Sequence, residues 1–238
     1  MSMLSNILNG IGSLIFAEEC IICHEPIASS LHGVCTKCRY QIPTTQYWLY
    51  EENPVTEHFD GLVPIYRASS FIFYSTHSPW RNAIHNFKYH NAWRIAYNMA
   101  RWYGRELKSS GLYDDVDIVV PIPLHYKKLL KRSYNQSTYI AEGIARELGI
   151  DYNSHLLYRR RNNPPQARNK ASQRWQNVEE LFAVRNAKRL QGKHILIVDD
   201  VLTTGATICS CVEAILRVAP DCRVSVATLA VTRSIERD

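Results

Sequence analysis

The sequence predicts an α/β fold: a doubly wound, mostly parallel sheet, with a small metal-binding module ahead of it. Strand-like apolar segments alternate with helix-like segments along the second half of the chain, which is the pattern of parallel β-α-β units. Residues 195–198 are an unbroken apolar run, as in a strand buried on both faces of a parallel sheet. Two Cys-x-x-Cys pairs near the N-terminus supply the ligands for the small module.

The first elements of the larger domain are rich in aromatic residues. Residues 62–66 and 70–74 contain β-branched and aromatic side chains and predict a short hairpin. Ser78 and Pro79 are typical of the N-cap and first position of a helix. A second, amphipathic helix is expected over roughly residues 92–107.

Four strands and two further helices are expected beyond that point. The strands are predicted over residues 116–120, 156–158, 193–198 and 223–229, and the helices over 133–148, ended by Gly149, and 208–218. Residues 127–132 are expected to form a basic loop, and 159–177 a long polar one. Ligands of such sheets bind at the carboxyl ends of the strands, near a topological switch point.

The segment after the apolar run at 195–198 combines two acids with a small, polar turn. Asp199 and Asp200 are placed to accept hydrogen bonds from a sugar diol. In the turn that follows, Gly205 permits a tight backbone, and threonine hydroxyls and a helix N-terminus can hold an anion. The sequence therefore predicts a phosphate site beside a ribose site.

The four N-terminal cysteines have the spacing of a structural zinc site. Cys20 and Cys23 are followed by Cys35 and Cys38, and two such pairs can close a tetrahedral site that has no open position. The alternative is a pair of redox motifs or free thiols, but a redox motif should follow a strand and open a helix. Residues around these pairs instead indicate loops.

Composition narrows the class of protein. The chain has 238 residues, is 46% hydrophobic and carries a formal charge of +6, which suits a globular protein with an anionic ligand. Its seven cysteines and the lack of a convincing signal peptide predict a reduced, cytoplasmic protein. The sequence contains no run of 18 apolar residues, so no membrane span is predicted. Residues 1–19 have helical apolar spacing and predict a docking helix.

Residues 198–207, VDDVLTTGAT, resemble the signature of type I phosphoribosyltransferases, which bind phosphoribosyl pyrophosphate (PRPP). The signature follows the two cysteine pairs and the segments IHNFKYHNAWR, IVVPIPLHYKKLLKRSYNQ and PPQARNKASQRWQNV. This order is similar to the ComF family, also called competence protein F or GntX-like, whose members are bacterial and cytoplasmic. Several members are implicated in DNA uptake during natural transformation. The resemblance implies residues 1–55 as a zinc-finger module with its linker, and 56–238 as a phosphoribosyltransferase-like domain.

The resemblance assigns roles to individual residues. It implies that Asp199 and Asp200 hold the ribose hydroxyls, that the turn wraps the 5′-phosphate, and that Mg²⁺ accompanies PRPP. Arg132 is expected to act in catalysis with the two acids, since it can bind pyrophosphate. The PRPP-binding residues expected are Asp199, Asp200, Val201, Leu202, Thr203, Thr204, Gly205, Ala206, Thr207, Lys131 and Arg132.

Two classes of function remain open on these residues. The first is a Mg²⁺-dependent transferase that moves the phosphoribosyl group of PRPP to an acceptor. The second is a non-catalytic module that senses PRPP or a nucleotide and binds single-stranded DNA, with competence proteins as further partners. The nucleic-acid-binding residues expected are Lys127, Lys128, Lys131, Arg132, Arg168 and Arg174.

The family pattern Arg-Gly-Phe-Asn-Gln appears here as Arg132-Ser133-Tyr134-Asn135-Gln136. Glycine is the residue that most readily adopts a positive φ. Serine in its place leaves the backbone conformation at this position open.

Overall fold

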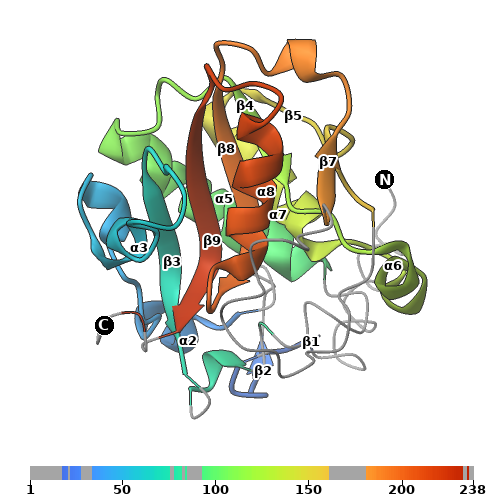
Figure 1. The fold of residues 1–238 in the computed structure, drawn as a ribbon. Helices are drawn as coiled ribbons and strands as arrows, with labels where there is room; N and C mark the ends of the chain where they lie inside the picture. Colours follow the sequence, from blue (N-terminus) through green and yellow to red (C-terminus); the bar gives the residue numbers. More distant parts are fainter. Residues whose placement is uncertain are drawn as a thin grey trace, which may run out of the picture.

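The computed structural model describes residues 18–20, 22–27, 34–75, 78–81, 84, 93–160, 181–232 and 235. Its centre is a five-stranded sheet in which every pairing is parallel, with the order β3-β9-β8-β4-β5 (Figure 1). The strands are β3 (Ala68–Tyr74), β4 (Ile118–Pro121), β5 (Asp151–Tyr152), β8 (His194–Leu202) and β9 (Arg223–Thr232). The predicted fold class is confirmed.

Helices cover both faces of the sheet (Figure 1). Helices α5 (Trp93–Ser110) and α7 (Gln136–Leu148) lie on one face, and α8 (Ala206–Leu216) lies on the other. Successive residues of β8 alternate between the two cores: Leu196 and Val198 pack with α5 and α7, whereas Ile195 and Ile197 pack with α8. Because both faces are covered, the predicted strand is apolar at consecutive positions.

Helices α5 and α7 approach each other closely at two glycines. A Cβ added at Gly143 would lie 2.7 Å from the carbonyl oxygen of Tyr97 and 2.8 Å from the Cβ of Ala100. A Cβ at Gly104 would lie 3.1 Å from the Cα of Ile144. The two backbones can pack at this distance only because neither glycine carries a side chain.

The hairpin predicted over residues 62–66 and 70–74 is wrong. Strand β3 instead pairs in parallel with β9, from Ala68 opposite Val226 to Tyr74 opposite Thr232. Residues 62–66 form no strand, although the N–H of Tyr66 donates to the carbonyl of Val224 at 2.8 Å. The apolar and aromatic residues of 70–74 therefore belong to a strand whose partner is far away in sequence.

Two other expectations need correction. Residues 127–132, predicted as a loop, belong to helix α6 (Tyr126–Arg132), whose N-cap is the side chain of His125. The strand predicted at 156–158 is β6 (Leu157–Arg159), but it pairs antiparallel with β7 (Phe182–Val184) in a separate small sheet. The helix predicted from residue 133 begins at Gln136 and ends at Gly149 as expected.

The segment between the cysteines and β3, which includes the expected linker, packs on the sheet. The N–H of Thr45 donates to Phe71 and the N–H of Phe73 donates to Pro43, so this segment lies along the outer edge of β3. Two short helical elements follow, η1 (Tyr47–Leu49) and α3 (Pro54–Glu57). Trp48 of η1 is buried against Phe71 and Tyr103.

The N-terminal cysteines lie in a small unit below the sheet (Figure 1). It consists of β1 (Glu18–Glu19), paired antiparallel with β2 (Pro26–Ile27), and helix α2 (Thr36–Tyr40). The docking helix predicted over residues 1–19 lies outside the described residues except for Glu18 and Glu19, which form β1. No helix in the described part of the chain has the length and apolar character to cross a membrane.

A charged cluster joins the amino ends of β8 and β9. Asp115 contacts the ring of His194 at 3.0 Å and the guanidinium of Arg223 at 3.0 Å, and His194 Nε2 lies 2.7 Å from Ser225 Oγ. An Asp-His-Ser arrangement can serve hydrolysis, but His194 and Ser225 are both fully buried. Burial also lowers the pKa of His194. The cluster therefore ties strands together and is closed to a substrate.

Replacing Gly143 by alanine tests the close contact of α5 and α7. Helix propensity alone would stabilise the variant by roughly 0.5–1 kcal/mol. We expect the opposite, a loss of about 1–3 kcal/mol in the free energy of unfolding, because the added Cβ meets a backbone carbonyl. Chemical denaturation measures the change, with Glu142→Ala on the same helix as a control. A stabilised Gly143→Ala variant would contradict the contact.

Candidate functional site

The acidic pair lies where β8 extends past its neighbour. Strand β4 ends at Pro121, opposite Val198, and the N–H of Ile122 makes the last bond to the carbonyl of Val198. Strand β8 continues to Leu202, paired with β9 alone. The chain leaves β4 for α7 on one face and leaves β8 for α8 on the other. The acids therefore lie at a topological switch point, where open α/β sheets bind ligands.

Asp199 is held by neighbours that position it at the sheet edge. The hydroxyl of Ser137, in the first turn of α7, donates to Asp199 Oδ1 at 2.9 Å, and the N–H of Asp200 donates to the same oxygen at 2.9 Å. Asp200 Oδ1 accepts from the N–H of Val201 at 2.8 Å. Each carboxylate thus fixes the backbone that follows it.

A hollow of about 240 Å³ follows Asp199. Its lining contains every residue of the predicted turn. Of the two predicted acids it contains Asp199 but not Asp200. Successive strand residues point to opposite faces, which explains the division of the acidic pair. The lining residues are Asp199, Val201, Leu202, Thr203, Thr204, Gly205, Ala206, Thr207 and Ile208.

The amino end of α8 opens into this hollow. Gly205 is the N-cap, and no side chain forms a capping hydrogen bond there. The first N–H groups of a helix lack intrahelical partners, and the helix dipole favours an anion beside them. Thr203 and Thr204 are exposed and can add hydroxyl donors. This arrangement, the cradle, is suited to a phosphate group.

Gly205 is required for a reason that the sequence did not show. Its φ of +70° is a conformation that favours glycine. Besides the tight backbone that the sequence predicts, the missing side chain leaves room for the protein itself, because a Cβ here would meet the ring of Phe59 at 2.9 Å. Phe59 and His58, which follow α3, pack behind the cradle. A larger residue at 205 would therefore collide with the protein itself.

Ser137 is a site residue that the sequence analysis missed, whereas Arg159 opens the basic segment 159–174, which was expected to supply a cation to the site. Arg159 ends β6 and lies over the ring of Phe182, at 5.1 Å from its centroid. Burial lowers the pKa of its guanidinium, and the charge of Asp199 opposes that shift. A cation thus lies within electrostatic range of the cradle. The signal available in the sequence was weak, because Arg159 is one of three consecutive arginines at the head of a long polar segment.

The basic residues predicted to bind pyrophosphate or DNA are dispersed. Arg132, the last residue of α6, donates to Gln136 Oε1 at 3.4 Å, beside the start of α7. It does not line the hollow. Lys127 is exposed on α6, and Lys128 and Lys131 lie on the same helix. The other two predicted residues, Arg168 and Arg174, lie outside the described part of the chain.

Ser133 has the backbone conformation expected of the family's glycine. Its φ is +66°, and it ends α6 by donating its N–H to the carbonyl of Leu129 at 2.7 Å. Serine therefore takes up a left-handed conformation that costs more for it than for glycine. The turn that leads into α7 is retained despite the substitution.

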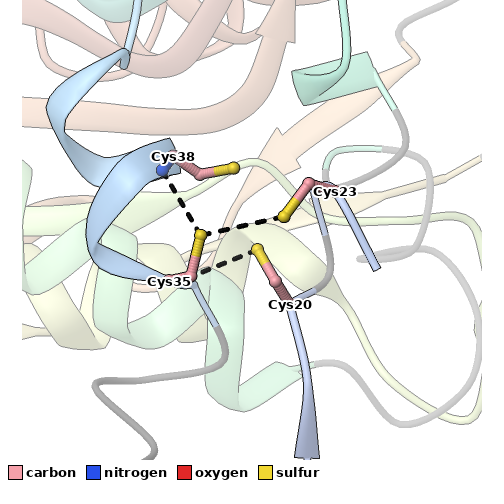
Figure 2. Close-up of side chains that lie close together, drawn as sticks. All are labelled: Cys20, Cys23, Cys35 and Cys38. Carbon is pink, nitrogen blue, oxygen red and sulfur yellow. Dashed lines mark hydrogen bonds between the residues drawn. The ribbon is translucent and has the colours of Figure 1, made fainter. Parts of the chain in front are cut away.

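The four cysteine side chains converge on one point (Figure 2). Their sulfurs all lie within 4.8 Å of one another, and Cys23 Sγ is 3.7 Å from Cys35 Sγ. Zinc–sulfur bonds of 2.3 Å in a tetrahedron require sulfurs about 3.8 Å apart. Backbone N–H groups of Cys35 and Cys38 donate to the sulfurs of Cys20 and Cys35, both at 3.4 Å. The donor set therefore fits a tetrahedral metal ion.

The thiols of this cluster have different environments. Burial of Cys20 opposes ionisation, but backbone N–H groups, with that of Cys35 foremost, lower its pKa to about 6. Burial and the neighbouring thiols raise the pKa of Cys38. Cys20, Ile22, Val34 and Cys38 are buried in the same core as α5 and β3. The cysteine unit is thus packed on the larger domain.

Comparison with known proteins identifies the C-terminal part of the chain. Residues 135–237 match the family described as "Phosphoribosyl transferase domain". This segment contains Ser137, the acidic pair and the whole cradle.

Three curated relatives show the wider similarity. The "DNA utilization protein YhgH" of Salmonella typhimurium is 29% identical over 210 residues, covering 83% of this chain and 90% of the relative. The "Competence protein F" of Haemophilus influenzae is 24% identical over 202 residues, or 81% and 88% of the two chains. The "Competence protein ComFC" of Bacillus subtilis is 33% identical over 121 residues, or 50% and 47%.

Proposed function

We propose that this chain, which is similar to competence protein F and matches a phosphoribosyl transferase domain over residues 135–237, binds PRPP and transfers its phosphoribosyl group to an acceptor. The observation that carries the proposal is the cradle: an acid at the sheet edge, followed by a side-chain-free cap on the N-terminus of α8. A ribose phosphate presents a diol, which the acid can hold, and a phosphate, which the helix N-terminus can hold.

The residues of the cradle would take separate parts of the substrate. Asp199, in the hollow, would accept one ribose hydroxyl, and Asp200, its neighbour on the strand, is proposed for the other. Residues 203–207 would hold the 5′-phosphate through N–H and hydroxyl donors. Lys131 and Arg132 are proposed for the pyrophosphate, and Arg159 adds positive charge near Asp199.

In the reaction, the bond between ribose C1 and pyrophosphate breaks while the acceptor bonds to C1. Pyrophosphate leaves with the electron pair, so positive charge develops on the ribose ring and negative charge on the leaving group. Mg²⁺, which prefers carboxylate and phosphate oxygens, would neutralise the leaving group when bound. The chain's own part is to fix the ribose and stabilise these charges.

Asp199→Asn should weaken PRPP binding while leaving the fold intact. The amide keeps the shape and one acceptor oxygen, so Ser137 retains a partner, but the charge is lost. A hydrogen bond to a charged group contributes about 1.5–3 kcal/mol, or roughly a tenfold to hundredfold change in Kd. Calorimetric titration with PRPP and Mg²⁺ measures it, and Asp221→Asn, an exposed site outside the cradle, is the control.

Equal affinity in wild type and Asp199→Asn would rule out the cradle as the PRPP site. Turnover needs a separate assay of pyrophosphate release with nucleobases and small amines as acceptors. Binding without release for every acceptor would favour the second function.

That second function is a binding module that holds PRPP or a nucleotide without turnover and binds single-stranded DNA. The observation in its favour is α6, at the edge of the molecule in Figure 1. It exposes Tyr126, Lys127 and Leu130 to solvent, the mixture of aromatic and basic groups that single strands contact. Relatives named for DNA utilization and competence are consistent with it.

Replacing Lys127 and Lys128 together by glutamine tests the DNA-binding role of α6. If both contact phosphates, the slope of log K against log salt for a single strand should fall by about 1.4. Fluorescence anisotropy over a salt series gives the slope. Lys108→Gln with Lys188→Gln removes the same charge elsewhere. An equal change in both double variants would indicate a general charge effect and no binding by α6.

We further propose that the cysteine cluster holds one structural zinc ion per chain. Elemental analysis of protein purified without added metal should find one equivalent, and Cys35→Ser should lose it and lower the melting temperature. Cys209→Ser, outside the cluster, should keep the metal. A fully folded, metal-free wild type would refute this assignment. A reducing, cytoplasmic location, in which thiolates stay available to a metal, is part of the same proposal.

A further inference from the structure

A second hollow lies between the cysteine unit and α5. Its volume, which includes space open to solvent, is about 380 Å³. It shares no residue with the cradle. The residues that line it are Val34, Arg39, Trp80, Asn98, Met99, Trp102 and Arg105.

The floor of this hollow is apolar and rigid. Val34, Trp80 and Met99 are each at most 5% exposed and belong to the core that α5 shares with the sheet. Trp102 packs edge-on against Phe71, with ring centroids 5.3 Å apart. A planar apolar ligand would therefore meet flat side chains that are already fixed in place.

The rim is polar and carries positive charge. The guanidinium of Arg39 lies 5.3 Å from the ring centroid of Trp102. Arg105 is exposed and touches only the carboxylate of Glu147, at 3.4 Å, among the described residues. Two arginines line the hollow, and no carboxylate does. Charge complementarity thus favours an anionic ligand.

Asn98 supplies one hydrogen-bonding group on an otherwise apolar wall. Within the described residues its carboxamide has no hydrogen-bond partner, while the indole N–H of Trp102 is taken by Glu106 at 3.1 Å. A carboxamide offers a donor and an acceptor side by side, which matches the edge of a nucleobase. An apolar pocket with a few converging polar groups is typical of a ligand site.

We propose that this hollow is a nucleotide site, which takes a nucleobase on the indole and methionine floor and its phosphate on Arg39 and Arg105. Asn98 hydrogen-bonds the base edge. The nucleotide can be free or part of a single strand, because both present the same base and phosphate. The cysteine unit contributes Val34 and Arg39, so the site exists only while that unit is docked on α5.

The test uses the full chain with bound metal and three probes: thymidine 5′-monophosphate, a single-stranded oligothymidine, and an abasic strand of equal length. Quenching of tryptophan fluorescence reports the free nucleotide, and anisotropy of labelled strands reports the others. The variants are Asn98→Leu and Arg105→Gln, and Lys108→Gln removes a charge from α5 outside the hollow. PRPP titration of each variant reports on the cradle separately.

Asn98→Leu should weaken a base-bearing probe about tenfold and leave the abasic strand unchanged, because only the base edge is lost. Arg105→Gln should weaken both, Lys108→Gln neither, and PRPP affinity should stay at the wild-type value in all three. Binding of the monophosphate identifies a free nucleotide as the source, whereas binding of the strand alone identifies single-stranded nucleic acid.

Three results would overturn the proposal. One is equal affinity of the wild type for abasic and base-bearing strands with no response to the monophosphate. Another is an Asn98→Leu variant that binds every probe like the wild type. The third is displacement of the nucleotide by an acidic peptide at the same concentration as by the strand, which would make the hollow a general site for anionic chains.

Discussion

The site depends on the unequal length of two adjacent strands. Strand β4 stops at Pro121, and a proline there and another at 123 cannot donate to a further ladder. Strand β8 runs on through Asp199 to Leu202 with support from β9 alone. A longer β4 would fill the space beside the end of β8. Ser137, from α7, and the proposed ligand hollow occupy that space instead. Without that difference in length, β4 would fill the space beside Asp199, and the proposed ligand site would be closed.

The local parts of the site could be predicted because each has a signal within a few residues. An unbroken apolar run marks β8, and the pair of acids with a glycine-containing turn marks the carboxyl end of a strand. Gly149 ends α7 for a similarly local reason, since its φ is +78°. The four-cysteine cluster could be predicted from spacing alone, and its converging sulfurs fit a metal site.

Features that depend on distant partners could not be predicted in this way. Strand β3 pairs with β9, which is more than a hundred residues later in the chain. The residues near β3 therefore do not indicate its parallel pairing. Helix α6 was expected to be a loop because its sequence is mostly basic. Its two leucines face solvent, so they give no sign of a buried helix face. The role of Phe59 behind Gly205 is likewise a contact between remote segments, and only the folded backbone reveals it.

The matched domain, residues 135–237, is smaller than the unit that can fold. Strands β3 and β4 and helix α5 all precede it. A fragment cut at that boundary would turn β9 into a bare edge, with its apolar residues and unpaired backbone groups open to other chains. It would also lose the wall behind Gly205. Such a fragment is an aggregation-prone half-sheet, so the recognisable domain and the cooperative folding unit have different limits in this protein.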